Sequence, residues 1–279
     1  MTVGFIGLGN IGRPMAKQLL KLSEPVSVFD VVPAATAELA ALGAQVAASP
    51  AALAAQCRII GICVRDDKDV DALLYGADGI FSNAQADTII AIHSTVTQDA
   101  ILRWHRDGVT LGLHVIDAPI TGGAGGAEAG TLCYMVGGDA VIVERCRPVF
   151  QCSAAKIVHG GVIGTGIALK LCNNLMAYAA FTAAHEGYKL AMACGLAPEK
   201  LTEVGQANGV VTPQMTAFLS GHLGLANNLE MLHQFFAPHA ALARKDLAAA
   251  LQTAENLQVM LPATQRNSEL IEDVFLNRY

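Results

Sequence analysis

The chain contains few charged and few aromatic residues, and this composition excludes several classes of protein. Only 15% of its 279 residues are charged, 5% are aromatic, and the formal net charge is −6. Such a chain has no basic surface with which to bind nucleic acid or an anionic membrane. The hydrophobic fraction of 53% is too high for a disordered chain. The composition therefore favours a folded protein with a large interior, arranged as one large domain or two smaller ones.

The sequence also lacks a secretion signal, a membrane span and a metal-binding motif. The opening residues MTVGFIGLG are typical of a strand, with no basic region and no cleavage site, so we expect no signal peptide. The longest charge-free part of the most apolar segment, Leu171 to Ala184, is too short to cross a membrane and contains two asparagines. The seven cysteines are scattered and form no CxxC pair. We therefore expect reduced cysteines in a cytoplasmic protein, and neither disulfides nor zinc ligands.

Short apolar strands alternate with short helices up to about residue 160, which predicts a doubly wound parallel sheet. The expected strands cover residues 2–8, 26–29, 46–47, 59–64, 88–93, 112–117, 131–136 and 156–159. The expected helices between them cover residues 14–22, 34–42, 50–56, 69–75, 98–107 and 140–150. Beyond this point only helical periodicity remains, over residues 165–194, 198–206, 213–220, 226–236, 239–256 and 263–276. We therefore predict an α/β domain over residues 1–161 and an all-helical domain over residues 162–279.

The segment from Val162 to Leu196 predicts one long helix over about residues 165–194, ending at Gly195. At 1.5 Å per residue it would be about 42 Å long, enough to run between two domains. Lys170 and Asn174 are four residues apart and share a face of this helix. A lysine in so apolar a helix either extends its ammonium group to water or is held inside for chemistry. Taken alone, the helix favours the first interpretation.

A glycine-rich turn follows the first expected strand and opens the first helix. Its residues are Gly7, Leu8, Gly9, Asn10, Ile11 and Gly12. An acidic residue, Asp30, ends the second strand. This context is typical of a Rossmann domain, in which the turn holds the pyrophosphate of a dinucleotide at a helix N-terminus. The alternative is a tight turn that binds no ligand. Because Asp30 would repel a 2′-phosphate and no arginine follows it, NAD is favoured over NADP as the cofactor.

Two further stretches lie where expected strands end, at the edge where such sheets bind ligands. Val64 ends the buried strand 59–64, and we include it among the cofactor-binding residues. Thr95 follows the strand 88–93, within His93-Ser-Thr-Val96. On position alone, Thr95 is equally suited to contact the cofactor or to cap the helix that follows.

The stretch from Asp117 to Gly130 contains more glycine than an ordinary connector requires. Glycine loses more conformational entropy on folding than any other residue, so a cluster of glycines is expected where a special backbone conformation requires it. Beside Thr121, the glycines Gly122 and Gly123 would expose backbone N–H groups as an anion-binding nest suited to a carboxylate. The alternative is a flexible hinge.

Four segments, in this order, resemble the signature segments of the β-hydroxyacid dehydrogenase family: GFIGLGNIGRPMA, HSTV, DAPITGGAGGAEAG and GTGIALKLCNN. A fifth, Arg244-Lys245-Asp246-Leu247, is similar to the family's KDL segment. The family includes 3-hydroxyisobutyrate dehydrogenase, tartronate semialdehyde reductase and glyoxylate/succinic semialdehyde reductase. The resemblance implies a Rossmann domain, a long interdomain helix, and a helical domain that also builds a homodimer or homotetramer.

The resemblance also implies residue roles in a reversible oxidation of a small hydroxy acid by NAD, without a metal. Lys170 would be the catalytic acid and base, at the cleft between the domains. The other implied contacts are Thr121, Gly122 and Gly123 with the substrate carboxylate, Asn174 with the substrate, Thr95 with the nicotinamide side, and Lys245 with cofactor and substrate.

Two departures from the family pattern leave the substrate open. His93 stands where the family usually has an acidic residue, and residues 226–243 match the family's approach to KDL poorly. The alternatives are a glyoxylate, succinic semialdehyde or tartronate semialdehyde reductase that works mainly in the reductive direction. Imine reductases share the architecture but lack the lysine, and 6-phosphogluconate dehydrogenases need more C-terminal helices. A catalytically silent NAD-binding sensor or scaffold is the alternative outside the enzymes. His185 and Glu186 are interpreted as packing or interface groups.

Overall fold

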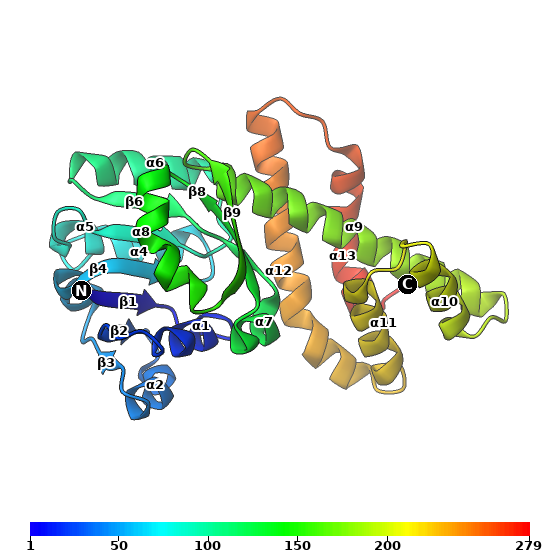
Figure 1. The fold of residues 1–279 in the computed structure, drawn as a ribbon. Helices are drawn as coiled ribbons and strands as arrows, with labels where there is room; N and C mark the ends of the chain where they lie inside the picture. The colour runs from blue at the N-terminus through cyan, green and yellow to red at the C-terminus, as the bar shows by residue number, and fades with distance from the viewer. The chain divides into compact units, whose positions relative to one another are not determined.

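The computed structural model describes residues 1–279 and divides them into two compact units, Met1–Lys170 and Leu171–Tyr279. In Figure 1 the strands of the first unit run from blue to green, and the second unit contains helices only. This arrangement confirms the predicted fold class, an α/β Rossmann domain followed by an all-helical region. The division between the units falls inside helix α9 (Thr165–Ala193).

The first unit is built on one nine-stranded sheet in the order β3-β2-β1-β4-β5-β6-β8-β7, with β9 paired to β8. Its strands are β1 (Thr2–Ile6), β2 (Val26–Phe29), β3 (Gln45–Val46), β4 (Cys57–Ile62), β5 (Ile89–Ile92), β6 (His114–Asp117), β7 (Ile120–Thr121), β8 (Leu132–Gly137) and β9 (Ala154–Gly161). The pairs from β3 to β6 are parallel, as is β8 with β9, but β8 runs antiparallel to β6 and β7. The sheet is therefore dominated by parallel pairs, as predicted, with an antiparallel part around β8 that was not predicted, because β7 is a two-residue strand that returns directly onto it.

The strand register aligns the carboxyl ends of the central strands. Residue pairing joins the last residues of β2, β1, β4, β5 and β6 into one row: Phe29, Ile6, Ile62, Ile92 and Asp117. The residues that follow each strand therefore begin at the same edge of the sheet. This is the edge at which sheets of this class bind ligands.

The helices of the first unit connect these strands. They are α1 (Gly12–Leu19), the 3-10 helix η1 (Pro33–Thr36), α2 (Ala37–Ala41), α3 (Pro50–Gln56), α4 (Asp67–Leu74), α5 (Ile80–Asn83), α6 (Gln98–Thr110), α7 (Gly123–Ala129) and α8 (Ala140–Gln151). Several start at side chains that accept hydrogen bonds from the first turn, including Asp66 at α4 and Asp139 at α8. The sequence predicted neither α5 nor α7. A continuous apolar core packs the helices against the sheet.

The second unit contains the rest of α9 with α10 (Pro198–Ala207), α11 (Pro213–Leu225), α12 (Leu229–Asn256) and α13 (Pro262–Leu276). The prediction of two helices over residues 226–236 and 239–256 was wrong, because α12 is continuous and contains Pro238. Proline removes one helical hydrogen bond. Burial of Phe236, Ala240, Ala243 and Leu247 on one side of α12 offsets this loss.

Aromatic rings fill the core of the second unit. Phe181 stacks on Phe218 with ring centroids 4.7 Å apart, and Phe275 meets both rings edge-on. His185 is buried beside His222, with ring centroids 5.6 Å apart. No helix of the structure is long and apolar enough to cross a membrane.

Candidate active site

The glycine turn after β1 has room for a ligand at one of its three glycines. Gly7 has a φ of +92°, and a methyl group there would lie 2.2 Å from the carbonyl oxygen of Cys63. A methyl group at Gly12 would lie 1.9 Å from the carbonyl oxygen of Gly7. Packing within the protein therefore requires both of these glycines. At Gly9 a methyl group would meet no atom within 4 Å, so the open space there fits the close approach of a dinucleotide.

Asp30 holds the glycine turn from the end of β2. Its Oδ2 accepts a hydrogen bond from the backbone N–H of Leu8 at 2.6 Å, and its Oδ1 accepts one from Val32 at 2.8 Å. A carboxylate has about four acceptor positions, so these two contacts leave capacity for ribose hydroxyls. The turn and Asp30 therefore fit the glycine turn and acidic strand end that hold a nicotinamide dinucleotide in Rossmann domains.

Val64 and Thr95 lie on loops that the structure ties together through Ser94. The hydroxyl of Ser94 accepts a hydrogen bond from the N–H of Val64 at 2.8 Å. A methyl group on Gly7 would lie 2.9 Å from the side chain of Val64, which places Val64 against the glycine turn. Thr97 caps α6 by accepting from Ala100, so the alternative role of Thr95 as the cap was wrong. Sequence analysis missed Ser94, although it stands beside Thr95.

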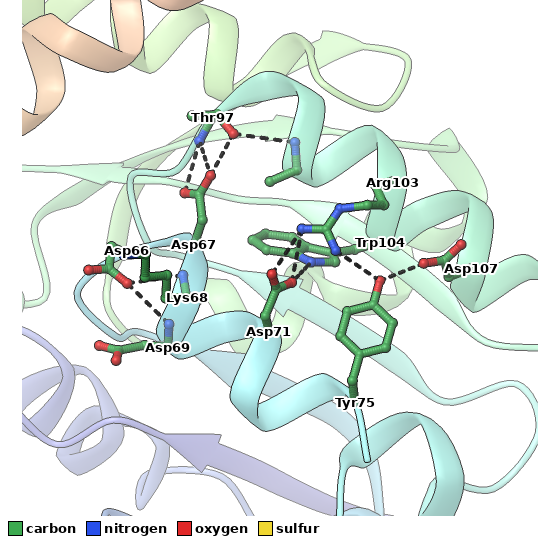
Figure 2. A network of polar contacts seen from close by, with 11 residues as sticks. Asp66, Asp67, Lys68, Asp69, Asp71, Tyr75, Thr97, Arg103, Trp104 and Asp107 are labelled. Carbon is green, nitrogen blue, oxygen red and sulfur yellow. Dashed lines mark hydrogen bonds and ion pairs between the residues drawn. The ribbon is translucent and has the colours of Figure 1, made fainter.

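A polar network fixes the two helices that follow these loops (Figure 2). Asp67 on α4 accepts hydrogen bonds from the hydroxyl and the N–H of Thr97, at 2.5 and 3.1 Å. Asp71, one turn later, accepts from the indole N–H of Trp104 at 2.6 Å and from Arg103 at 3.0 Å. The starts of α4 and α6, and so the loops before them, are held at a fixed spacing.

Asp117, at the end of β6, fixes the start of α9. Its carboxylate is fully buried, with Oδ1 accepting from the N–H of Gly164 at 2.9 Å and Oδ2 from the N–H of Ile167 at 2.7 Å. Burial raises the pKa of Asp117, and these backbone hydrogen bonds act in the opposite direction. Lys170, which is half-buried, follows this first turn of α9 directly. Sequence analysis named Asp117 only as the start of the glycine-rich stretch.

The glycine-rich stretch forms a turn and then a helix. Thr121 ends β7, Gly122 and Gly123 have φ values of +123° and +63°, and α7 begins at Gly123. The amide of Gln18 donates to the carbonyl oxygens of Ala127 and Glu128, at the far end of α7. Residues 123–129 are therefore helical, which contradicts the alternative of a flexible hinge for them. Gly122 and Gly123 are exposed and accessible to an anion.

His93 is a core residue. Its Nδ1–H donates to the carbonyl oxygen of Ala118 at 2.9 Å, and its ring stacks on Phe5 with centroids 5.8 Å apart. Tyr134 and Phe150 meet the same ring edge-on. Burial lowers the pKa of His93 to about 4, so the imidazole is neutral at neutral pH. These contacts give His93 a packing role in the core of the first unit.

In the second unit, Asn174 belongs to a buried polar group centred on Asp246. The amide Nδ2 of Asn174 donates to Oδ2 of Asp246 at 2.7 Å, and the hydroxyl of Tyr178 donates to the same oxygen at 3.0 Å. Burial, with the Asp246 charge, raises the pKa of Tyr178. Nζ of Lys245 lies 3.2 Å from Oδ1 of Asp246. Sequence analysis used Lys245 but missed Asp246, which is the next residue of the same motif.

The structure thus groups the predicted residues within each unit. In the first unit the glycine turn, Asp30, Val64 and the Thr95 loop are linked along the carboxyl edge of the sheet. In the second unit Asn174 and Lys245 meet at Asp246. No group of three or more His, Cys, Asp or Glu side chains is placed to hold a metal ion. A Rossmann sheet with an open glycine turn and an acidic strand end defines a dinucleotide-binding protein of the dehydrogenase class.

Comparison with known protein families covers both units. Residues 2–166 match the NAD binding domain of 6-phosphogluconate dehydrogenase. Residues 164–277 match a family described as NAD-binding of NADP-dependent 3-hydroxyisobutyrate dehydrogenase.

Similar individual proteins include several dehydrogenases. The chain is 33% identical to 2-(hydroxymethyl)glutarate dehydrogenase of Eubacterium barkeri, over 98% of this chain and 88% of the relative. It is 35% identical to NAD-dependent L-serine dehydrogenase of Pseudomonas aeruginosa, over 72% of this chain and 68% of the relative. The solved structure of Mycobacterium tuberculosis 3-hydroxyisobutyrate dehydrogenase with L-serine superposes with a TM-score of 0.86 at 27% identity, covering 99% of this chain and 98% of the other.

The chain belongs to the β-hydroxyacid dehydrogenase family. It is therefore an oxidoreductase that acts on a hydroxy acid with a nicotinamide dinucleotide, which confirms the function expected from the resemblance.

Proposed function

We propose that the protein reversibly oxidises an acid of the form HOCH₂–CHR–COO⁻ to the corresponding aldehyde, with Lys170 as the general acid and base. The compounds that name the relatives, 3-hydroxyisobutyrate, L-serine and 2-(hydroxymethyl)glutarate, share this form and differ only in R. The observation that carries the proposal is the anchoring of α9. The buried carboxylate of Asp117 binds its first turn, directly before Lys170.

Each step of the proposed reaction is assigned to a residue of this chain. The backbone N–H groups of Thr121, Gly122 and Gly123 hold the substrate carboxylate, and Asn174 binds the substrate beside Lys170. Lys170 accepts the hydroxyl proton as the carbinol C–H bond breaks and the C=O bond forms; in the reverse direction it returns that proton. Bound NAD supplies the acceptor for the hydride. Thr95 contacts the nicotinamide side, and Lys245 contacts cofactor and substrate.

NAD is the proposed cofactor in preference to NADP. The carboxylate of Asp30 stands where the 2′-phosphate of NADP would bind, and these two acidic groups would repel each other. The next residues, Val31 and Val32, are exposed and offer no cation for a phosphate. A value of kcat/KM with NADP equal to or above that with NAD would contradict this preference.

A substrate panel tests the proposal. Wild-type protein is assayed with R as methyl, amino and carboxyethyl, with NAD and with NADP, and in reverse with the three semialdehydes and glyoxylate. We expect oxidation of at least one member of the panel. Lys170→Ala should abolish turnover and leave NAD binding intact, while the exposed control Lys156→Ala should retain both. Retained turnover in Lys170→Ala contradicts its role, and tight NAD binding without turnover of any compound favours a sensor.

We further propose a cytoplasmic homodimer or homotetramer. The second unit leaves large apolar side chains exposed, among them Met176 (68%), Leu190 (67%) and Phe235 (56%), which supports burial of this surface against another copy. None of the seven cysteines forms a disulfide, which supports a reducing compartment. Light scattering across a dilution series measures the oligomeric state, and a monomer at micromolar concentration would contradict the proposal.

A further inference from the structure

The carboxylate of Asp246 is buried in the second unit and binds two side chains of α9. Asp246 is 2% exposed, and its Oδ2 accepts the hydrogen bonds of Asn174 and Tyr178. Its Oδ1 is buried without a partner in hydrogen-bond geometry, although Nζ of Lys245 lies 3.2 Å away. Burying a carboxylate with one unsatisfied oxygen costs stability. Stability alone therefore does not account for an acidic residue at this position.

The acidic group determines which way the amide of Asn174 faces. Nδ2 of Asn174 donates to the carboxylate, so the side of Asn174 that faces Asp246 is the NH₂ group. The carbonyl Oδ1 of Asn174 then points away from Asp246, where its contact is a weak 3.3 Å hydrogen bond from Asn173. Without Asp246 the amide could rotate by half a turn and offer a donor where it now offers an acceptor.

The amide of Asn174 is the group that the proposed function places on the substrate. We propose that Asp246 is a positioning residue: by accepting from Nδ2, it keeps Oδ1 of Asn174 turned away from the carboxylate, so that this oxygen faces the substrate as an acceptor. The inference rests on the proposed function, because the orientation matters only if Asn174 contacts the substrate.

Two substitutions at this position separate orientation from charge. Asp246→Leu removes every acceptor, and loss of orientation at the substrate should lower kcat by about 10²-fold. Asp246→Asn keeps an oxygen that can accept from Asn174, so it should lose no more than about tenfold in kcat. The control is Thr182→Val, which removes a different hydrogen bond of α9 in the same unit, to Asn267 at 2.5 Å. This control should lower the melting temperature without changing kcat.

A double-mutant cycle tests whether Asp246 acts through Asn174. If it does, either substitution at Asp246 has no further effect on kcat in an Asn174→Ala background, because the two residues form one unit. Should Asp246→Leu fail to fold by circular dichroism, the cycle with Asp246→Asn decides. Three results would each overturn the inference. They are effects of the Asp246 and Asn174 substitutions that multiply, a kcat for Asp246→Leu near the wild-type value, and an equal loss of kcat in the Leu and Asn variants. Wild-type protein without turnover would overturn the proposed function as well, whereas active wild type with a multiplicative cycle overturns only the role of Asp246.

Discussion

Acid should destabilise the first unit through His93. The imidazole is neutral in the folded state, with a pKa of about 4, and an unfolded histidine has a pKa near 6.5. As the pH falls through this window the unfolded chain takes up a proton that the folded chain does not. The stability that His93 provides is therefore complete above pH 6.5 and is lost progressively down to about pH 4. The difference between the two pKa values corresponds to about 3 kcal/mol over the window.

The variant His93→Asn isolates this contribution. An asparagine amide can donate to the carbonyl oxygen of Ala118 as Nδ1 does, but it neither titrates nor fills the space between Phe5, Tyr134 and Phe150. Because of the lost packing, the variant should be less stable than wild type at pH 7, by about 3 kcal/mol. Between pH 6.5 and pH 4 the two unfolding free energies should converge by about the same amount. Other titrating groups cancel in the difference.

Trp104 provides a measurement confined to the first unit. It is the only tryptophan of the chain and is fully buried, so its fluorescence reports unfolding of this unit alone. Urea titrations of both proteins, at pH values from 4 to 7, give the two free energies. If the difference between the two unfolding free energies stays constant from pH 4 to pH 7, a buried, neutral His93 is refuted.

Four further substitutions test other parts of the structure. Gly7→Ala puts a methyl group 2.2 Å from a carbonyl oxygen at a φ of +92°, so the unfolding free energy of the first unit, measured by Trp104 fluorescence, should fall by more than about 2 kcal/mol. Gly9→Ala should unfold like wild type but bind NAD at least about tenfold more weakly by calorimetry. Asp117→Ala removes the acceptor of two N–H groups and should cost about 3 kcal/mol in the same urea assay, and a loss below about 1 kcal/mol would contradict the anchoring of α9. Tyr178→Phe should cost only about 1 kcal/mol, measured as a small fall in the melting temperature.

Features carried by short stretches of sequence were predictable. The glycine turn stands next to the strand it follows, and Asp30 ends the next strand, so their meeting follows from parallel pairing alone. The length of α9 follows from an apolar segment closed by Gly195. In each case the residues that decide the structure lie within one or two elements of each other.

Features that depend on distant partners were not predictable. Asp117 and Asp246 each appear in the sequence as one acidic residue in a recognisable motif, yet the groups that they bind lie 47 and 72 residues away. The continuity of α12 through Pro238 was not predicted, because a sequence shows the hydrogen bond that proline removes and not the packing around it. The antiparallel return at β7 escaped prediction since a two-residue strand has no periodicity to detect.

The two buried carboxylates specify the rotation of α9 about its axis, which its apolar composition leaves weakly determined. Apolar residues occupy much of its circumference, so hydrophobic burial alone discriminates weakly between rotations of the helix about its axis. Asp117 specifies the rotation of the first turn within the first unit, because only one setting brings the N–H groups of Gly164 and Ile167 to its two oxygens. Asp246 does the same within the second unit through Asn174 and Tyr178. Hydrogen bonds to a buried carboxylate are directional, so they fix the rotation of the helix, which an apolar surface alone does not specify.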